Sequence, residues 1–291
     1  MKITGILNIN KPAGITSYDV VDVIKKLFIG SKVGHTGTLD PVATGVLPIL
    51  IGDATKLSDN LTAENKAYRV KMLLGVETDT YDITGKIVSA SVVNKDEIYI
   101  RERIKRFIGV QEQTPPQYSA IKVSGKKAYE YAREGKEVEL KPRTIEIHDI
   151  NNIAVDLKKR EVTFDVYCTK GTYVRSLVND IGRKLGCGAT MIDLIRLRNG
   201  NFFIEDSIAL YDFLKLNFED MKKHIVPIED YYDDLKKINR LKDEYTKFLN
   251  GVKLPYDEQD KLVKVYYNNK YKGLGQIKDG ILKRYLIENE E

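Results

Sequence analysis

The sequence predicts an α+β protein with two domains of unequal size. Its 291 residues exceed one typical domain but fall short of several large ones. Segments in which apolar residues alternate, as in strands, are interspersed with segments in which they recur at helical spacing. With 42% hydrophobic and 31% charged residues the chain can bury a sizeable core, so we expect a soluble globular protein.

The first elements are expected to be a strand, a turn and a helix. Residues 5–9 read as a strand, and residues 11–14 supply the turn. Thr16 and Asp19, three residues apart, suit a capping box at the helix start. The helical pattern ends before residues 34–48, which are expected to form a Gly-rich loop, where functional side chains often lie. The apolar residues at helical spacing before that loop are Val20, Val21, Ile24, Leu27 and Phe28.

The middle of the chain shows strand, turn and helix patterns in succession. Apolar residues from Tyr68 to Leu74 alternate with charged ones, which predicts a strand with Tyr68 on its buried face. Residues 79–85 form a turn-rich connection. A second amphipathic helix is indicated by Ile100, Ile104, Phe107 and Ile108.

Residues 114–145 are predicted to be an insertion that projects from the first domain. This stretch mixes tyrosines with basic residues, the stacking surfaces and phosphate contacts that RNA binding uses. A solvated face has the same composition, and both interpretations stay open. The residues concerned are Tyr118, Tyr129, Tyr131, Lys122, Lys126, Lys127, Arg133, Lys141 and Arg143.

The last third predicts a strand, a turn and a helix, followed by a β-rich tail. Residues 162–168 alternate as a strand, Gly171 turns the chain, and residues 174–185 take up helical spacing. The tail then changes to short strands and turns. We therefore place a large domain at residues 1–232 and a small β-rich domain at residues 236–291.

Composition excludes some classes of protein. A net charge of +5, from 47 basic and 42 acidic residues, is weak evidence for a nucleic-acid partner. Cys168 and Cys187 lack metal-ligand or redox spacing and read as structural thiols of a reducing compartment. With only three scattered histidines, a metal site is not expected. The sequence opens without a leader pattern and its most apolar run, residues 46–51, is too short to span a bilayer, which predicts a cytoplasmic protein.

Asp40 is the first candidate for a catalytic group. It precedes Pro41, which pushes its backbone towards extended geometry and holds its carboxylate in a constrained loop. A carboxylate held in a constrained loop is suited to act as a nucleophile. On local sequence alone, however, an aspartate before proline more often organises a turn through its own backbone.

Three further residues have both a functional and an ordinary interpretation. Arg175 lies in the first helical turn, where a cation is unfavourable, so an anionic partner such as Asp40 or a phosphate is expected. A bidentate contact would orient Asp40 and favour its ionised form. Tyr68 could stack on a base or exchange a proton, although strand tyrosines usually pack. His35 could steer a displaced base or simply bond a nearby carbonyl.

Taken together, these residues lie in motifs that resemble the TruB family of pseudouridine synthases, in the expected order along most of the chain. By that resemblance Asp40 is the catalytic aspartate, Arg175 is its partner, and Tyr68 is the active-site tyrosine. Leu194 would line the uracil pocket, and Tyr173 and His35 would contact the substrate. The matching segments are residues 11–17, 34–41, 43–45, 67–70, 170–175, 186–189 and 194–197.

The resemblance also implies a fold and a reaction. The fold is a mixed, mainly antiparallel sheet flanked by helices, with residues 118–127 in an RNA-gripping insertion and a PUA domain from about residue 238. The reaction turns the T-loop uridine at position 55 of tRNA numbering into pseudouridine, with the base flipped out and no cofactor. The expected partner is tRNA, and we expect a monomer with no obligatory protein partner.

Three other functions remain as alternatives. A noncatalytic RNA-binding or RNA-folding protein could use the same basic insertion and β-rich tail. A tRNA methyltransferase is disfavoured, because no Gly-rich strand-to-helix fingerprint is found. A guide-dependent pseudouridine synthase would share the motifs, but the chain has no long basic tail for extra partners, which favours stand-alone action. Whether Asp40 acts as nucleophile or base stays open.

Overall fold

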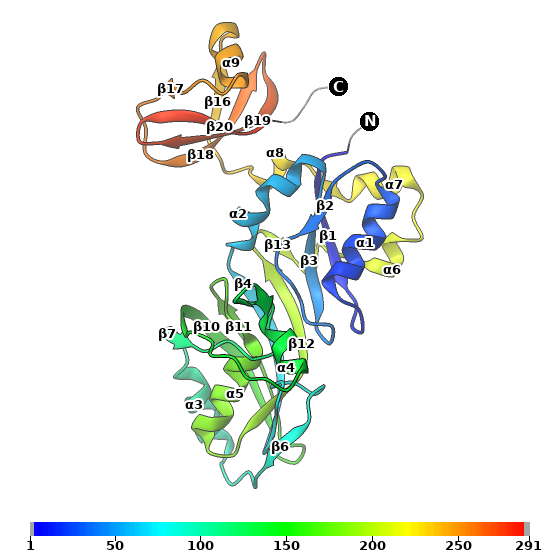
Figure 1. The fold of residues 1–291 in the computed structure, drawn as a ribbon, viewed down its shortest axis with the longest axis vertical. Helices are drawn as coiled ribbons and strands as arrows, with labels where there is room; N and C mark the ends of the chain where they lie inside the picture. The colour runs from blue at the N-terminus through cyan, green and yellow to red at the C-terminus, as the bar shows by residue number, and fades with distance from the viewer. Residues whose placement is uncertain (1–2, 288–291) are drawn as a thin grey trace.

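The structure, a computed structural model, describes residues 3–287 and confirms the α+β class. Figure 1 shows a long first domain and a small β-rich domain at one end, joined near α8. The large sheet follows the order β14-β1-β3-β12-β4-β11-β10-β7, with β2, β13 and β15 pairing beside it. In the described part of the chain, only β1–β14 and β3–β12 pair in parallel within this sheet.

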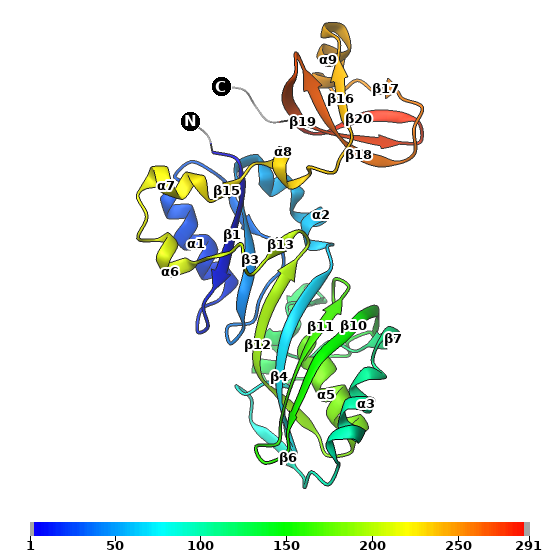
Figure 2. The ribbon, with the colours of Figure 1, turned by 180° about the vertical axis from the view of Figure 1, so that it is seen from behind.

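The strands of the large sheet come from both halves of the first domain, so residues distant in sequence become neighbours (Figure 2). Their bounds are β1 (Gly5–Lys11), β2 (Val33–His35), β3 (Thr44–Ile51), β4 (Lys66–Leu74), β7 (Gly109–Gln113), β10 (Arg143–Asp156), β11 (Glu161–Cys168), β12 (Ala189–Asn199), β13 (Phe202–Phe203), β14 (Ile208–Ala209) and β15 (Ile225–Val226).

Helices and short hairpins flank the large sheet, except α9, which lies beside the sheet of the small domain (Figure 1). The bounds of the helices are α1 (Ser17–Leu27), η1 (Gly52–Leu57, a 3-10 helix), α2 (Ser58–Thr62), α3 (Glu97–Lys105), α4 (Ala128–Arg133), α5 (Val174–Leu185), α6 (Leu210–Phe213), α7 (Phe218–Lys223), α8 (Ile228–Tyr231) and α9 (Lys242–Leu249). The two hairpins are β5 (Val76–Thr78) with β6 (Ile87–Ala90), and β8 (Lys122–Val123) with β9 (Lys126–Lys127).

The first helix forms as its sequence predicts. The Thr16 side chain accepts a hydrogen bond from the Asp19 amide at 3.1 Å, and the Asp19 carboxylate accepts one from the Thr16 amide at 2.7 Å. This reciprocal capping box satisfies two amides at the helix start. Val20 and Ile24 are fully buried against the sheet, in one core cluster with side chains of α3 and α5.

Helix α3, which corresponds to the second amphipathic helix expected from the sequence, is shorter than predicted. It ends at Lys105, and the amides of Phe107 and Ile108 close single turns onto Ile104 and Lys105 instead of continuing the helix. Gly109, at φ 115, then redirects the chain into β7. Ile108 is 43% exposed, so its assignment to the core face of this helix was wrong.

Gly45 allows β3 to lie against β12. Its φ is +102°, and an added Cβ would overlap the Arg196 backbone. We expect Gly45→Ala to lower the free energy of unfolding by about 3 kcal/mol or more. Gly14→Ala is the matched control, because Gly14 has φ +88° but open space around it, so only the backbone strain of about 1–2 kcal/mol remains. Urea unfolding measures both, and equal losses would contradict this account.

The second domain is a five-stranded sheet in the order β16-β18-β19-β20-β17, with α9 beside it. Its strands are β16 (Lys237–Arg240), β17 (Leu254–Pro255), β18 (Lys261–Tyr267), β19 (Lys270–Lys278) and β20 (Ile281–Ile287).

This domain is docked on the first. Leu274 and Leu286 are buried in a cluster with residues of β1, β3 and α2. The Tyr285 hydroxyl also donates to the Asn60 side chain at 2.6 Å. Among residues 3–287, no helix combines the length and apolar character needed to cross a membrane.

Candidate active site

Asp40 lies in the loop between β2 and β3, and the N-terminal motif fixes that loop. The Lys11 ammonium, which is fully buried, donates to the carbonyls of Pro12 and Ile15 at 2.8 Å each and also contacts that of Pro41. The Ser17 hydroxyl accepts from the Leu39 amide at 2.8 Å and donates to the Leu39 carbonyl at 3.1 Å. The segment on either side of Asp40 is therefore anchored to the start of α1.

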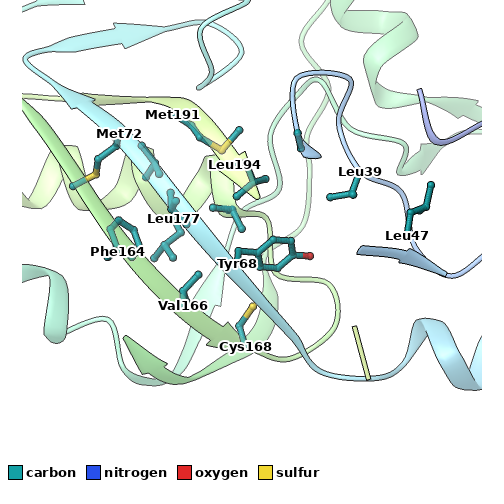
Figure 3. Close-up of a cluster of buried hydrophobic side chains, with 14 of the residues drawn as sticks. Leu39, Leu47, Tyr68, Met72, Phe164, Val166, Cys168, Leu177, Met191 and Leu194 are labelled. Atoms are coloured by element: carbon teal, nitrogen blue, oxygen red, sulfur yellow. The ribbon is translucent and has the colours of Figure 1, made fainter. Parts of the chain in front are cut away.

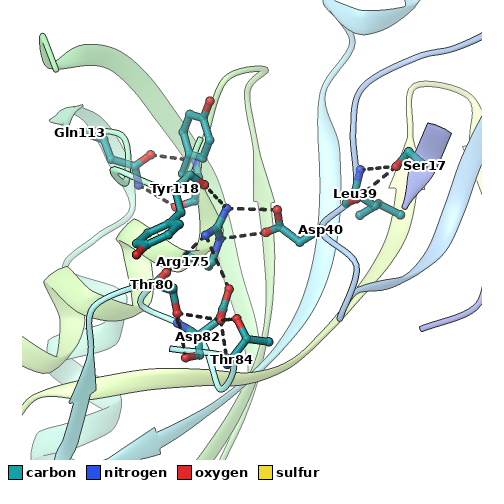
Figure 4. Close-up of polar contacts among 10 residues, drawn as sticks. Ser17, Leu39, Asp40, Thr80, Asp82, Thr84, Gln113, Tyr118 and Arg175 are labelled. Carbon is teal, nitrogen blue, oxygen red and sulfur yellow. Dashed lines mark hydrogen bonds and ion pairs between the residues drawn. The ribbon is translucent and has the colours of Figure 1, made fainter. Parts of the chain in front are cut away.

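The Asp40 carboxylate forms a bidentate pair with Arg175, as predicted (Figure 4). One oxygen lies 2.8 Å from Nε and the other lies 3.0 Å from Nη2. The Asp40 backbone carbonyl also accepts from the Ala43 amide at 3.0 Å, so the residue organises a turn as well. Two parallel hydrogen bonds fix the plane of the carboxylate, which a reacting group requires.

Other groups hold the Arg175 guanidinium from the opposite side. Its Nη1 lies 3.5 Å from an Asp82 carboxylate oxygen and donates to the Thr80 carbonyl at 3.3 Å. Its Nη2 donates to the Tyr118 carbonyl at 3.0 Å. Since the Arg175 side chain is 7% exposed and that of Asp40 is 32% exposed, the arginine is the fixed partner and the carboxylate faces the accessible side.

The charges around Asp40 act in opposite directions. Burial raises the pKa of the Asp40 carboxyl above its ordinary value, Arg175 opposes this rise, and the Asp82 carboxylate adds to it. The net direction is upward, so Arg175 limits the rise without reversing it. Arg175 does favour the ionised form of Asp40, as expected, but the effect of burial on the Asp40 pKa is larger than the effect of Arg175.

Tyr68 and Leu194 form an apolar wall on adjacent strands. Tyr68 lies on β4 and Leu194 on β12, and both belong to the buried cluster that contains Leu39, the residue before Asp40 (Figure 3). Tyr68 is opposite Arg196 in the strand register, and the Arg196 guanidinium lies close to the Tyr68 hydroxyl. Burial raises the pKa of Tyr68 to about 12, while Arg196 counteracts the rise.

Tyr173 and His35 lie at the edges of this arrangement. Tyr173 is the N-cap residue of α5, two positions before Arg175, and burial raises the pKa of its hydroxyl. His35 ends β2, and its Nδ1 is buried without a hydrogen-bond partner among the described residues. Burial lowers the pKa of His35 and Arg196 lowers it further, so the neutral imidazole is favoured.

Sequence reasoning missed two buried charged residues of the site. From the sequence, Asp82 was expected to lie in an ordinary turn. It is only 4% exposed, since Thr80 and Thr84 donate hydrogen bonds to its carboxylate and Arg175 faces it. The threonines two residues before and after it were the available signal. Arg196 is 1% exposed and donates to the carbonyls of Val46 at 2.6 Å and Gly37 at 3.2 Å. Its partners are distant in sequence.

The chemistry of the site is that of a carboxylate. Among the described residues, no group of three or more His, Cys, Asp or Glu side chains is arranged to hold a metal ion. An oriented carboxylate beside a pinned arginine can act as a nucleophile or a base. The adjacent apolar wall of Tyr68 and Leu194 offers a flat surface for a planar ring.

Comparison with known families identifies this arrangement. The N-terminal domain of TruB family pseudouridylate synthases matches residues 25–174, and the C-terminal domain of tRNA pseudouridylate synthase B matches residues 175–232. The chain belongs to the TruB family. The two matched regions meet between Val174 and Arg175, at the start of α5, and together include every candidate site residue.

Proteins named tRNA pseudouridine synthase B are similar to this chain over nearly their whole length. The tRNA pseudouridine synthase B of Clostridium kluyveri is 46% identical, over 94% of this chain and 96% of that protein. The enzyme of the same name from Clostridium tetani is also 46% identical, over 94% and 95% respectively. This TruB chain is therefore a pseudouridine synthase, as its motifs suggested.

Solved structures support the fold. A chain of a Cbf5-Nop10-Gar1 complex superposes with a TM-score of 0.71 at 28% identity, covering 98% of this TruB chain and 84% of that chain. A chain of an H/ACA RNP bound to a substrate RNA containing 2'-deoxyuridine gives a TM-score of 0.69 at 28% identity, with 94% and 77% covered. These matches confirm the mixed, mainly antiparallel architecture.

Proposed function

We propose that this enzyme converts the T-loop uridine at position 55 of tRNA numbering into pseudouridine, alone and without a guide RNA. The observation that carries the proposal is the bidentate pair between Asp40 and Arg175 beside the wall of Tyr68 and Leu194. The names of the similar proteins support tRNA as the substrate.

The reaction is an isomerisation that consumes nothing. The bond between uracil N1 and ribose C1′ breaks, and a bond between uracil C5 and the same C1′ forms. C5 loses its hydrogen as a proton and N1 gains one, so the atoms balance without a cofactor. Asp40 would act on the sugar or the base in its ionised form, and Arg175 would keep its carboxylate oriented.

The substrate must leave the T-loop stack to reach Asp40. Flipping a base costs a few kcal/mol, which pocket contacts offset. In our proposal the uracil stacks on Tyr68 and is enclosed by Leu194, Tyr173 contacts the nucleotide, and neutral His35 lies near the space that the base leaves. These roles rest on the residues' positions around the Asp40 loop.

Two regions outside the pocket would bind the rest of the tRNA. In the insertion, Arg133 lies over the Tyr129 ring at 5.2 Å and Lys126 over the Tyr131 ring at 4.9 Å. Such cation and ring pairs can offer both charge and stacking area to RNA. The β-rich residues 236–291 would add a PUA-like contact.

We also propose that the enzyme works in the cytoplasm as a monomer with no obligatory protein partner. Cys168 and Cys187 are both free and buried, which fits a reducing compartment.

Tyr68→Phe is expected to lower the single-turnover rate by about 10²-fold, the scale of one lost proton-transfer group. The ring and its stacking remain, so tRNA affinity should not change. The hydroxyl's contact with buried Arg196 is lost. Tyr167→Phe is the matched control, because this tyrosine of the neighbouring strand also loses one hydroxyl contact, with the Asn65 side chain at 3.3 Å. Equal rates for wild type and Tyr68→Phe would remove the hydroxyl from the mechanism.

The overall proposal is tested by incubating the purified protein alone with a T-loop transcript tritiated at uracil C5. Tritium release is expected, because C5 must lose its hydrogen as a proton after it bonds to C1′, when the planar base is restored. A transcript with cytidine at position 55 should release none from that site. Tight binding without release would favour a noncatalytic RNA-binding protein, and release only after a guide RNA is added would exclude stand-alone action.

A further inference from the structure

Gln113 joins the entry of the insertion to the first turn of α5. Its side-chain amide donates to the Tyr173 carbonyl at 3.1 Å, and its side-chain oxygen accepts from the Tyr173 amide at 2.8 Å. Gln113 is the last residue of β7 and is 4% exposed. A buried amide that satisfies both backbone groups of one residue fixes that residue as a neighbouring strand would.

The next residues add two more contacts to the same helical turn. The Thr114 carbonyl accepts from the Ser176 hydroxyl at 2.8 Å, and the Tyr118 carbonyl accepts from Arg175 Nη2 at 3.0 Å. The segment 113–118 therefore contacts three residues at the start of α5: Tyr173, Arg175 and Ser176.

The start of α5 needs such external support. Its N-cap residue, Tyr173, provides no side-chain capping bond, so the first amides of the helix lack the usual local partner. Arg175 also places a cation at the positive end of the helix, which is unfavourable. Without contacts from outside, this turn would fray and the guanidinium would move relative to Asp40.

We propose that Gln113 is a positioning residue for the reaction: it holds the backbone of Tyr173 so that Arg175 meets Asp40 in the bidentate geometry. The inference rests on the proposed role of Asp40. It also gives the segment that leads into the insertion a direct physical connection to the catalytic carboxylate. A structural role limited to stability would lower the unfolding temperature and leave the ionisation of Asp40 unchanged.

The test is the pH dependence of single-turnover tritium release by Gln113→Leu. Arg175 opposes the rise in the Asp40 pKa, so a loosened Arg175 should let that pKa rise further. The acidic limb of the profile should then move to higher pH, and the plateau rate should fall by about 10-fold or more, since small displacements of reacting groups are costly. If this variant does not fold, Gln113→Met, which fills similar volume without branching, replaces it.

Gln111→Leu is the matched control. Gln111 lies two residues earlier on the same strand, and its side-chain amide donates to the Phe107 carbonyl at 2.6 Å instead of to α5. We expect its acidic limb to stay at the wild-type position. An unmoved limb in the Gln113 variant, or an equal movement in both variants, would overturn the inference. Absence of release by the wild-type protein would instead overturn the proposed function, so the two failures are distinguishable.

Discussion

Asp40→Asn is expected to abolish pseudouridine formation, with a loss of at least about 10⁴-fold in the single-turnover rate, while tRNA binding stays intact. The amide keeps the shape of the side chain but can neither attack nor accept a proton as a carboxylate does. Burial already disfavours the charged form of Asp40, so the free energy of unfolding should fall by no more than about 1 kcal/mol. Tritium release and filter binding measure the two effects separately.

The matched control is Asp165→Asn. Asp165 forms a bidentate pair with Arg69 at 2.8 Å for both bonds, the same geometry as the pair in the site. This second pair joins β4 to β11, and its arginine is half exposed. Its loss should leave the reaction rate unchanged. A rate close to wild type for Asp40→Asn would refute the central role of Asp40.

Arg175→Lys is expected to lower the single-turnover rate by about 10²-fold. A lysine ammonium keeps the charge but cannot make two parallel bonds to the Asp40 carboxylate, so the carboxylate can rotate. It also leaves the contacts to Asp82, Thr80 and Tyr118 only partly satisfied.

The pH dependence of the rate should also change in a defined direction in Arg175→Lys. The pKa of Asp40 is already raised by burial, and the proposed reaction uses its ionised form, so we expect the rate to fall as pH drops through that pKa. A weaker Arg175 contact should move this acidic limb to higher pH. Arg69→Lys, which removes the bidentate pair with Asp165, should not move it. A limb that moves to lower pH in Arg175→Lys would contradict the assigned electrostatics.

The sequence was sufficient where a signal was local. The capping box at Thr16 and Asp19 and the alternation that buries Tyr68 were correctly predicted, because each depends on residues close in the chain. The pairing of Asp40 with Arg175 is a contact across 135 positions. The cation at the helix start predicted only an anionic partner, and the resemblance to the TruB family named Asp40 as that partner.

The sequence was insufficient where a partner lies far away and the residue itself looks ordinary. Gln113 resembles any polar strand residue until β7 is placed beside α5. Arg196 continues an alternating strand, and only the parallel contact of β12 with β3 buries it beside the loop that carries Asp40. The end of α3 before Ile108 depends on where Gly109 turns the chain. The PUA-like role of residues 236–291 stays a prediction.

The most direct test maps the product. A full-length unmodified tRNA transcript is incubated with the purified protein alone, treated with carbodiimide, and read by primer extension, which stops at pseudouridine. We predict one new stop, at the T-loop uridine of position 55, with wild type and Asp165→Asn but not with Asp40→Asn. No stop at that position, or the same stop with Asp40→Asn, would contradict the account.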